Sequence, residues 1–185
     1  MRLTLTALAL LSLAARTNGE QAGRADMADG ATMPTSTAPS TAMPTVAAGY
    51  LAMAGASDQF EIQSSTLALQ KSQNSGVRMF AQMMIDHHRG TTEQLTTAAR
   101  AAGMTPPPPQ LNPMQRDMMA KLQAASGAAF DRLYIEQQRT AHQSALALHS
   151  TYADRGDTPQ LQQVARAAVP IIQQHITEAG KLTAG

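Results

Sequence analysis

The amino-acid sequence predicts an all-α fold, a four-helix bundle that follows a disordered N-terminal segment. Aromatic residues make up only 3% of the 185 residues, so Ala, Leu, Met and Val must fill the core, which favours helices over strands. After about residue 50, apolar residues recur at steps of three and four. Glycines, prolines and cap residues divide this region into segments of helical length.

Residues 1–19 have the pattern of a secretory signal peptide. A basic start precedes LTLTALALLSLAA, an apolar run of about 13 residues, whereas roughly 20 are needed to span a bilayer. We therefore expect cleavage and a periplasmic or secreted protein whose mature chain has no transmembrane span. An uncleaved membrane anchor is the alternative.

Residues 20–48 are predicted to form a disordered linker. The stretch ATMPTSTAPSTAMPTVAAG consists almost entirely of Ala, Thr, Ser, Pro and Met, and it has no hydrophobic periodicity. It can serve as a passive spacer or as a tether to the cell envelope.

The helical-bundle domain is expected over residues 50–183. Ser57 is a candidate cap for the first helix, and Gly103 a left-handed terminator for the second. Asn112 and Pro113 suit the start of a third segment. The expected helical ranges are about 57–72, 76–102, 112–125, 128–155 and 158–181. We count four helices, the third of which is interrupted near residue 126.

Polar residues on the apolar faces are the candidates for function. His87, His142 and His175 each fall on a face expected to be buried, with His88 at the shoulder of its stripe, and Glu61 lies on the first helix. A buried imidazole needs partners for both ring nitrogens. A metal ion can supply one partner and a carboxylate the other.

Two interpretations of these residues stay open, a metal site and a metal-free hydrogen-bonded network. The expected metal ligands are Glu61, His87, His142 and His175. The supporting residues expected around them are Asp86, Asp131 and Tyr134. Imidazole and carboxylate donors suit iron, copper or zinc. The metal-free network would join the same side chains.

Composition excludes several other classes of function. A net charge of +1 argues against nucleic-acid binding, and the absence of cysteine excludes disulfides, iron–sulfur clusters and thiol catalysis. Neither G-x-S-x-G nor a glycine-rich phosphate loop is present. No catalytic residue set emerges, and the partners expected are other proteins, of unknown identity.

Three phrases of the sequence resemble a known bacterial family. They are FEIQSSTLALQKSQNSGVRMFAQMMIDHH, GAAFDRLYIEQQRTAHQSALALHSTYADRGD and LQQVARAAVPIIQQHITEA. Over about residues 56–182 the chain is similar to domain-of-unknown-function family 4142 of the ferritin-like superfamily. The resemblance implies an exported helical bundle, an outer-membrane or periplasmic protein, without an established activity. MMIDHHRG alone also resembles domain-of-unknown-function family 305, whose members are associated with copper handling.

The ferritin-like resemblance raises the question of a di-iron site. Such sites use Glu-x-x-His on two helices, and this chain has no Glu-x-x-His. We therefore expect an exported, non-enzymatic envelope protein that holds a single metal ion inside the bundle. The alternatives are a metal-dependent oxidoreductase and a metal-free structural or stress-related interaction module.

Overall fold

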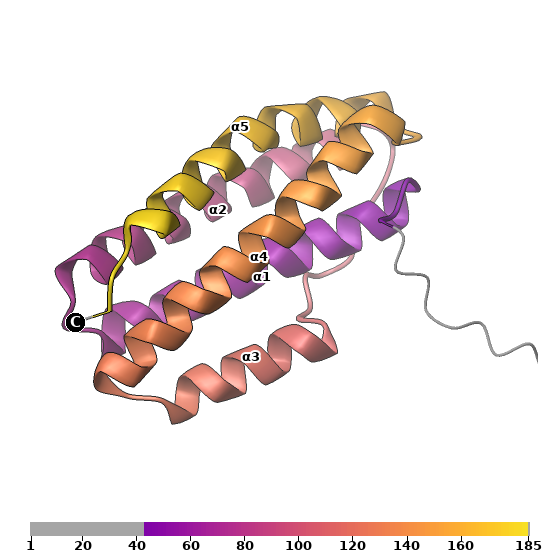
Figure 1. The fold of residues 1–185 in the computed structure, drawn as a ribbon. Coiled ribbons are helices and arrows are strands. Elements are labelled where there is room, and N and C mark those ends of the chain that lie inside the picture. The colour runs from indigo at the N-terminus through magenta and orange to yellow at the C-terminus, as the bar shows by residue number, and fades with distance from the viewer. Residues whose placement is uncertain (1–42, 185) are drawn as a thin grey trace, which may run out of the picture. The chain divides into compact units, whose positions relative to one another are not determined.

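The computed structural model describes residues 43–184, which form five α-helices and no β-strand (Figure 1). The helices are α1 (Ala47–Lys71), α2 (Ser75–Ala101), α3 (Pro113–Ala124), α4 (Gly127–Arg155) and α5 (Pro159–Lys181). The predicted all-α fold is confirmed. The predicted signal peptide, and the predicted linker as far as residue 42, lie outside the described residues.

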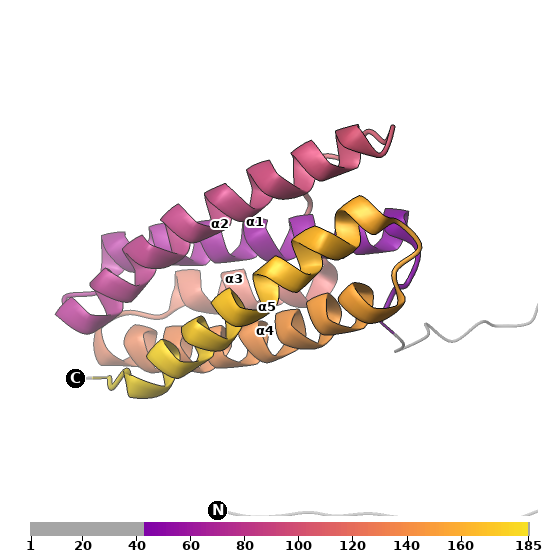
Figure 2. The same ribbon diagram turned by 90° about the horizontal axis from the view of Figure 1, so that it is seen from above.

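The four long helices form a bundle of two antiparallel pairs, α1 with α2 and α4 with α5 (Figures 1 and 2). Helix α1 also packs against α4, and α2 against α5, so α2 and α4 occupy opposite corners. The chain reaches α4 from α2 through a long connection that contains α3. One long crossover of this kind is typical of ferritin-like bundles, as predicted.

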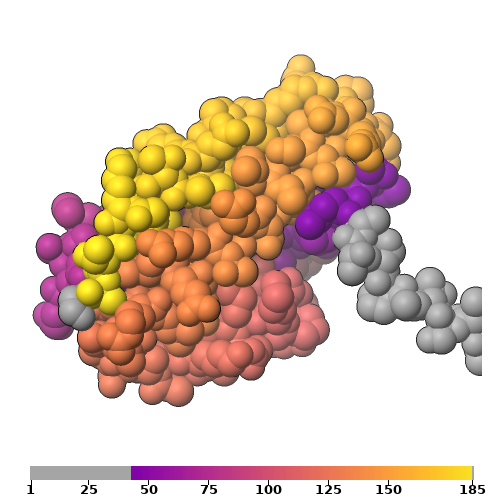
Figure 3. Space-filling model, viewed as in Figure 1, coloured from indigo at the N-terminus to yellow at the C-terminus, as the bar shows by residue number. Residues whose placement is uncertain are grey.

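Helix α3 is a separate helix, and the prediction of one helix interrupted near residue 126 is wrong. Ala125 and Ser126 have extended backbones, and Gly127 follows with φ of +54°, in the left-handed region that glycine tolerates. The chain therefore reverses between α3 and α4. Helix α3 packs outside the bundle on α1 and α4, and Figure 3 shows it beside α4.

Helix α1 begins at Ala47, ten residues before the predicted cap Ser57. Its first turns are held by tertiary contacts, because Tyr50 and Leu51 are buried. The backbone N–H of Ala47 also donates to Asp157 Oδ1 at 3.0 Å, in the turn between α4 and α5. The first helix therefore includes Ala47 and Ala48, the last two residues of the predicted linker.

The other helix ends lie close to their predicted positions. Asn112 caps α3 through a capping box with Gln115, as expected, whereas Asn74 rather than its neighbour Ser75 caps α2. Gly103 ends α2 with φ of +73°, as predicted. Within residues 43–184, no helix combines the length and the apolar character needed to cross a bilayer.

The core consists of two large apolar clusters, one toward each end of the bundle. The first contains Phe60, Ala68, Val77, Phe80, Ala81, Met84, Met119, Leu122, Phe130, Tyr134, Ile135 and Ala179. The second contains Ala47, Tyr50, Leu51, Ala54, Leu95, Ala99, Leu148, Tyr152, Ala153, Leu161 and Ala165. Buried polar side chains from all four long helices lie between these clusters or, for Glu61, directly beside Phe60 at the edge of the first cluster, and we call this set the polar layer. Its members are Asp58, Glu61, His88, His142 and His175.

Candidate metal centre

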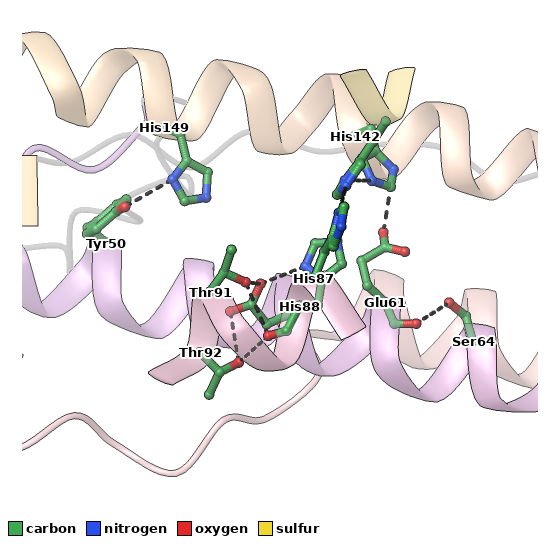
Figure 4. A network of polar contacts seen from close by, with 11 residues as sticks. Tyr50, Glu61, Ser64, His87, His88, Thr91, Thr92, His142 and His149 are labelled. Atoms are coloured by element: carbon green, nitrogen blue, oxygen red, sulfur yellow. Dashed lines mark hydrogen bonds and ion pairs between the residues drawn. The ribbon is translucent and has the colours of Figure 1, made fainter. Parts of the chain in front are cut away.

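Three buried histidines from three helices meet in the polar layer. They are His88 on α2, His142 on α4 and His175 on α5, and each is at most 6% exposed. One ring nitrogen of each lies within 4.8 Å of a ring nitrogen of the other two. Figure 4 shows how His88 and His142 approach one another from facing helices. We call these three residues the histidine cluster.

Asp58 on α1 fixes the orientation of His88. A carboxylate only accepts hydrogen bonds, so His88 Nδ1 donates across the 2.8 Å to Asp58 Oδ1. The hydroxyls of Thr91 and Thr92 donate to the two oxygens of the same carboxylate, each at 2.9 Å (Figure 4). The other ring nitrogen, His88 Nε2, is buried and has no hydrogen-bond partner among the described residues.

The pKa of His88 is raised above its ordinary value. Burial lowers it, but the hydrogen bond to Asp58, the charge of Asp58 and the charge of Glu61 together outweigh the effect of burial. Asp58 therefore holds the ring of His88 in one orientation and makes its other nitrogen, Nε2, a more basic lone-pair donor.

His142 is held by its own helix. Its Nδ1 lies 2.8 Å from the carbonyl oxygen of Gln138, so Nδ1 carries the proton and donates it. Its Nε2 lies 3.2 Å from His175 Nδ1. Burial lowers the pKa of His142, against the charge of Glu61 and with the help of His88, so the ring is neutral at pH 7 and Nε2 has a free lone pair.

His175 connects the cluster to the surface. Its Nε2 lies 2.8 Å from Nδ1 of His87, which is exposed on α2. Burial, followed by the neighbouring rings of His142, His88 and His87, brings the pKa of His175 well below its ordinary value. In the neutral state, hydrogen bonds run from His87 through His175 and His142 to the carbonyl of Gln138.

Glu61 adds a carboxylate beside His142. The side chain is buried, and Oε1 lies 3.8 Å from His142 Nδ1, which is beyond hydrogen-bond distance (Figure 4). Its Oε2 is buried without a hydrogen-bond partner. A buried carboxylate in this state is unfavourable unless a nearby cation compensates for its charge.

The structure brings together the four residues predicted as ligands, Glu61, His87, His142 and His175, but it reverses the expected orientations of His87 and His88. His88 is buried and His87 is exposed, whereas the sequence interpretation directed His87 inward and put His88 at the shoulder. The reason is that α2 also buries Ile85, which turns position 88 rather than position 87 toward the core.

The predicted supporting residues lie apart from the histidine cluster. Asp86 is exposed and accepts hydrogen bonds from Gln82. Asp131 is buried, but it precedes His142 by 11 residues, about 16 Å along the helix. Tyr134 is buried in the first apolar cluster, where its hydroxyl lies 2.8 Å from Ser65 Oγ.

Asp58 is the site residue that the sequence interpretation missed. With the first helix expected to start at Ser57, Asp58 stood in its first turn, where an acidic residue is unremarkable. Because α1 begins at Ala47, Asp58 lies in mid-helix. Its spacing of three from Glu61 puts both carboxylates on one face, and this spacing was the available signal.

A second polar network lies in the other apolar cluster. The hydroxyl of Tyr50 is hydrogen-bonded to His149 Nδ1 at 3.0 Å, and its ring stacks on Tyr152 with centroids 3.9 Å apart. Tyr152 in turn donates to Asp157 Oδ1 at 2.9 Å. This network joins the start of α1 to the end of α4 and supplies a histidine outside the cluster.

Comparison with known proteins supports the family and the fold. The sequence profile of the family described as Domain of unknown function (DUF4142) matches residues 32–182, in agreement with the resemblance in the sequence. No curated protein sequence matches the chain.

Two similar solved structures carry the titles "CopM in the Cu(II)-bound form" and "CopM in the Ag-bound form (by co-crystallization)". The first has a TM-score of 0.63 and 18% identity, and the match covers 75% of this chain and 96% of that one. The second has a TM-score of 0.61 and 18% identity, with 74% and 93% covered. At this identity the likeness establishes the fold alone.

Proposed function

The chain belongs to the DUF4142 family, and from its buried histidines we propose that the bundle binds one transition-metal ion in the polar layer. The observation that carries the proposal is the convergence of three imidazoles from three helices within 4.8 Å. The burial of His88 Nε2 without a hydrogen-bond partner adds to it. An unpartnered imidazole nitrogen that points into a cluster of two others is the donor arrangement that such an ion requires.

In this proposal the three ligand nitrogens are His88 Nε2, His142 Nε2 and His175 Nδ1. Metal–nitrogen bonds of 2.0–2.1 Å at tetrahedral angles put ligand nitrogens about 3.3 Å apart. The 3.2 Å between His142 Nε2 and His175 Nδ1 matches that separation. A small inward movement of His88 would complete a three-imidazole site with one further position for water or another ligand.

Each proposed ligand has an outer partner at its second ring nitrogen. His88 has Asp58, His142 has the carbonyl of Gln138, and His175 has His87. Such partners fix the tautomer and orientation of metal-binding imidazoles. With its Nδ1 engaged, His175 would carry its proton on Nε2 and donate it to His87 Nδ1.

The proposal changes the roles of two residues that the sequence predicted as ligands. Glu61 faces the Nδ1 side of His142, away from the nitrogen left for a metal, so we assign it the role of a buried counter-charge. His87 becomes the outer partner of His175. His88 takes the ligand position that the sequence interpretation gave to His87.

Copper is the metal that we favour among iron, copper and zinc. Three neutral imidazoles suit zinc and Cu(II), and among divalent first-row metals Cu(II) binds a given nitrogen site most tightly. The similar CopM structures, solved with Cu(II) and with silver, support the same choice.

A metal-free network is the second candidate, favoured by the continuous hydrogen bonds from His87 through His175 and His142 to Gln138. That network satisfies these three rings without an ion. It gives no partner to His88 Nε2, and for this reason we rank it second.

We further propose that the protein is exported to the periplasm or secreted, from the basic and apolar pattern of residues 1–19. Expression of the full chain followed by cell fractionation and N-terminal sequencing tests this. Mature protein that starts near residue 20 in the periplasmic or culture fraction supports export, whereas full-length protein in the cytoplasm contradicts it.

The metal proposal is tested on untagged protein loaded with Cu(II), desalted and measured by mass spectrometry for metal content. We expect about one equivalent per chain, lost in His142→Ala and His175→Ala. His149→Gln is the matched control, because His149 is a half-buried, hydrogen-bonded histidine outside the cluster. We also expect Cu(II) to raise the melting temperature of the parent and not of His142→Ala. Equal metal content in the parent and both cluster variants would overturn the proposal.

A further inference from the structure

A surface pocket of about 370 Å³ opens between α2 and α5, directly above His87. Its polar lining comes from Asp86, His87, Thr91 and Gln94 on α2 and from Gln174 on α5. A carboxylate, an imidazole and two amides are groups that can replace part of the water around a divalent cation.

The pocket reaches the histidine cluster through two of its lining residues. His87 lies 2.8 Å from His175 Nε2, so one ring touches both the pocket and the cluster. Thr91 lines the pocket and donates to Asp58, the residue that orients His88. The bottom of the pocket is therefore one side chain away from two of the three proposed ligands.

The other large cavity has a different character. It lies between α1, α3 and α4, has a volume of about 390 Å³, and its lining includes Met53, Phe60, Met114 and Leu148. None of the three histidines lines it. Its polar lining residues carry hydroxyl and amide groups, and none is a carboxylate or an imidazole that would attract a divalent cation strongly.

From this geometry we propose that the pocket between α2 and α5 is the route by which a divalent metal ion reaches the histidine cluster. Asp86 and His87 make the first contacts, and movement of the His87 ring opens the way to His175. This inference rests on the proposed metal-binding function, and it assigns a role to Asp86 and to the exposure of His87.

Gly90 offers a way to close the pocket without disturbing the core. It lines the pocket, and a Cβ added there would meet no atom within 4 Å. Gly90→Leu should therefore fill the pocket and leave the cluster intact. Gly180→Leu is the matched control, because Gly180 also lies on an exposed helix face with open space around its Cα and does not line the pocket.

The experiment is stopped-flow mixing with Cu(II), followed through quenching of tyrosine fluorescence, together with equilibrium competition against a chelator. We expect Gly90→Leu to slow association about ten-fold or more. It should slow dissociation equally, because a barrier on the route changes both rates and leaves the Kd unchanged. Asp86→Asn should slow association about three-fold, with a weaker dependence on salt.

Association of Gly90→Leu at the rate of Gly180→Leu, with the Kd unchanged, would show that the ion enters elsewhere and would overturn this inference alone. Failure of the parent protein to bind Cu(II), or binding that His142→Ala retains, would instead refute the metal site itself. A changed Kd in Gly90→Leu at an unchanged association rate would also contradict a role in access.

Discussion

His88 Nδ1 lies 2.8 Å from Asp58 Oδ1, and this contact engages one ring nitrogen while the other, Nε2, stays buried without a hydrogen-bond partner. The carboxylate also accepts hydrogen bonds from Thr91 and Thr92. One aspartate on α1 therefore holds three side chains of α2 in place, at the level where the histidine cluster forms.

Replacing Asp58 should weaken metal binding more than replacing an exposed aspartate. We expect Asp58→Ala to lower Cu(II) affinity about 10- to 100-fold, because His88 loses its orienting partner. The metal-free protein should lose about 1–3 kcal/mol of stability, because buried donors lose their acceptor. Competition titration and urea denaturation measure the two effects. Asp154→Asn, at an exposed position of α4, is the control and should change neither quantity.

Glu61→Gln should separate stability from metal binding. Removing a buried charge with an unpartnered oxygen should raise the free energy of unfolding of the metal-free protein by about 1 kcal/mol or more. Cu(II) affinity should fall, because the counter-charge beside His142 is lost. Glu93→Gln, at an exposed position of α2, should leave both unchanged. A Glu61→Gln protein that is less stable than the parent and equally tight for Cu(II) would contradict this role.

The metal-free domain should lose stability in mild acid through His149. Burial brings the pKa of His149 down from 6.5 to about 4, against the charge of Asp58 and with the help of His88. The unfolded chain takes up a proton below about pH 6.5 while the folded chain stays neutral, so stability falls as the pH drops toward about 4. The lowered pKa values of His142 and His175 act in the same direction.

Chemical denaturation at several pH values between 7 and 4 measures this slope. His149→Gln should show a shallower slope than the parent, because the residue no longer titrates. The raised pKa of His88 has the opposite sign, and its contribution is lost as the pH rises through its folded pKa. A parent slope that is flat, or equal to that of His149→Gln, would be inconsistent with a half-buried His149 that stays neutral in the folded chain.

Gly156→Ala should destabilise the turn between α4 and α5. A Cβ at Gly156 would lie 2.6 Å from both the carbonyl oxygen and Cε1 of Tyr152, and Tyr152 is buried. The backbone or the tyrosine must move, and we expect a loss of about 1–3 kcal/mol. Gly90→Ala is the control and should be neutral or slightly stabilising, because its surroundings are open and alanine favours the helix. Thermal melting of the two variants provides the comparison.

Much of the fold could be predicted from sequence because α2, α4 and α5 carry recognisable apolar stripes and have glycine, proline or capping residues near their ends. Gly103, Asn112 and Pro159 mark ends that the structure reproduces. The start of α1 could not be predicted, because Ala47 to Ala54 lack a capping side chain and continue the small-residue composition before them. Contacts with the α4–α5 turn decide that these residues are helical.

The candidate site could be predicted in part. His142 and His175 lie on strongly apolar faces, and both are buried as expected. The side chains of neighbouring residues point in directions about 100° apart around the helix axis. Where the apolar stripe has few residues, its position is not precise enough to tell whether His87 or His88 lies on the buried face. Which of the two histidines is buried depends on how α2 is rotated about its axis against α1 and α5. This rotation is set by the packing of the helices and not by the sequence of one helix.

The polar layer also has a consequence for how the bundle comes apart. Each long helix contributes to both large apolar clusters, whereas between them many contacts are hydrogen bonds and imidazole edges, and a smaller apolar cluster of Ala145, Ala168 and Ile172 joins α4 to α5. Opening that starts at one end can therefore stop at mid-length, which gives the domain two partly independent unfolding units. An ion bound by residues of α2, α4 and α5 would couple these units, so that they unfold in one cooperative transition. Its binding would then stabilise both ends of the bundle.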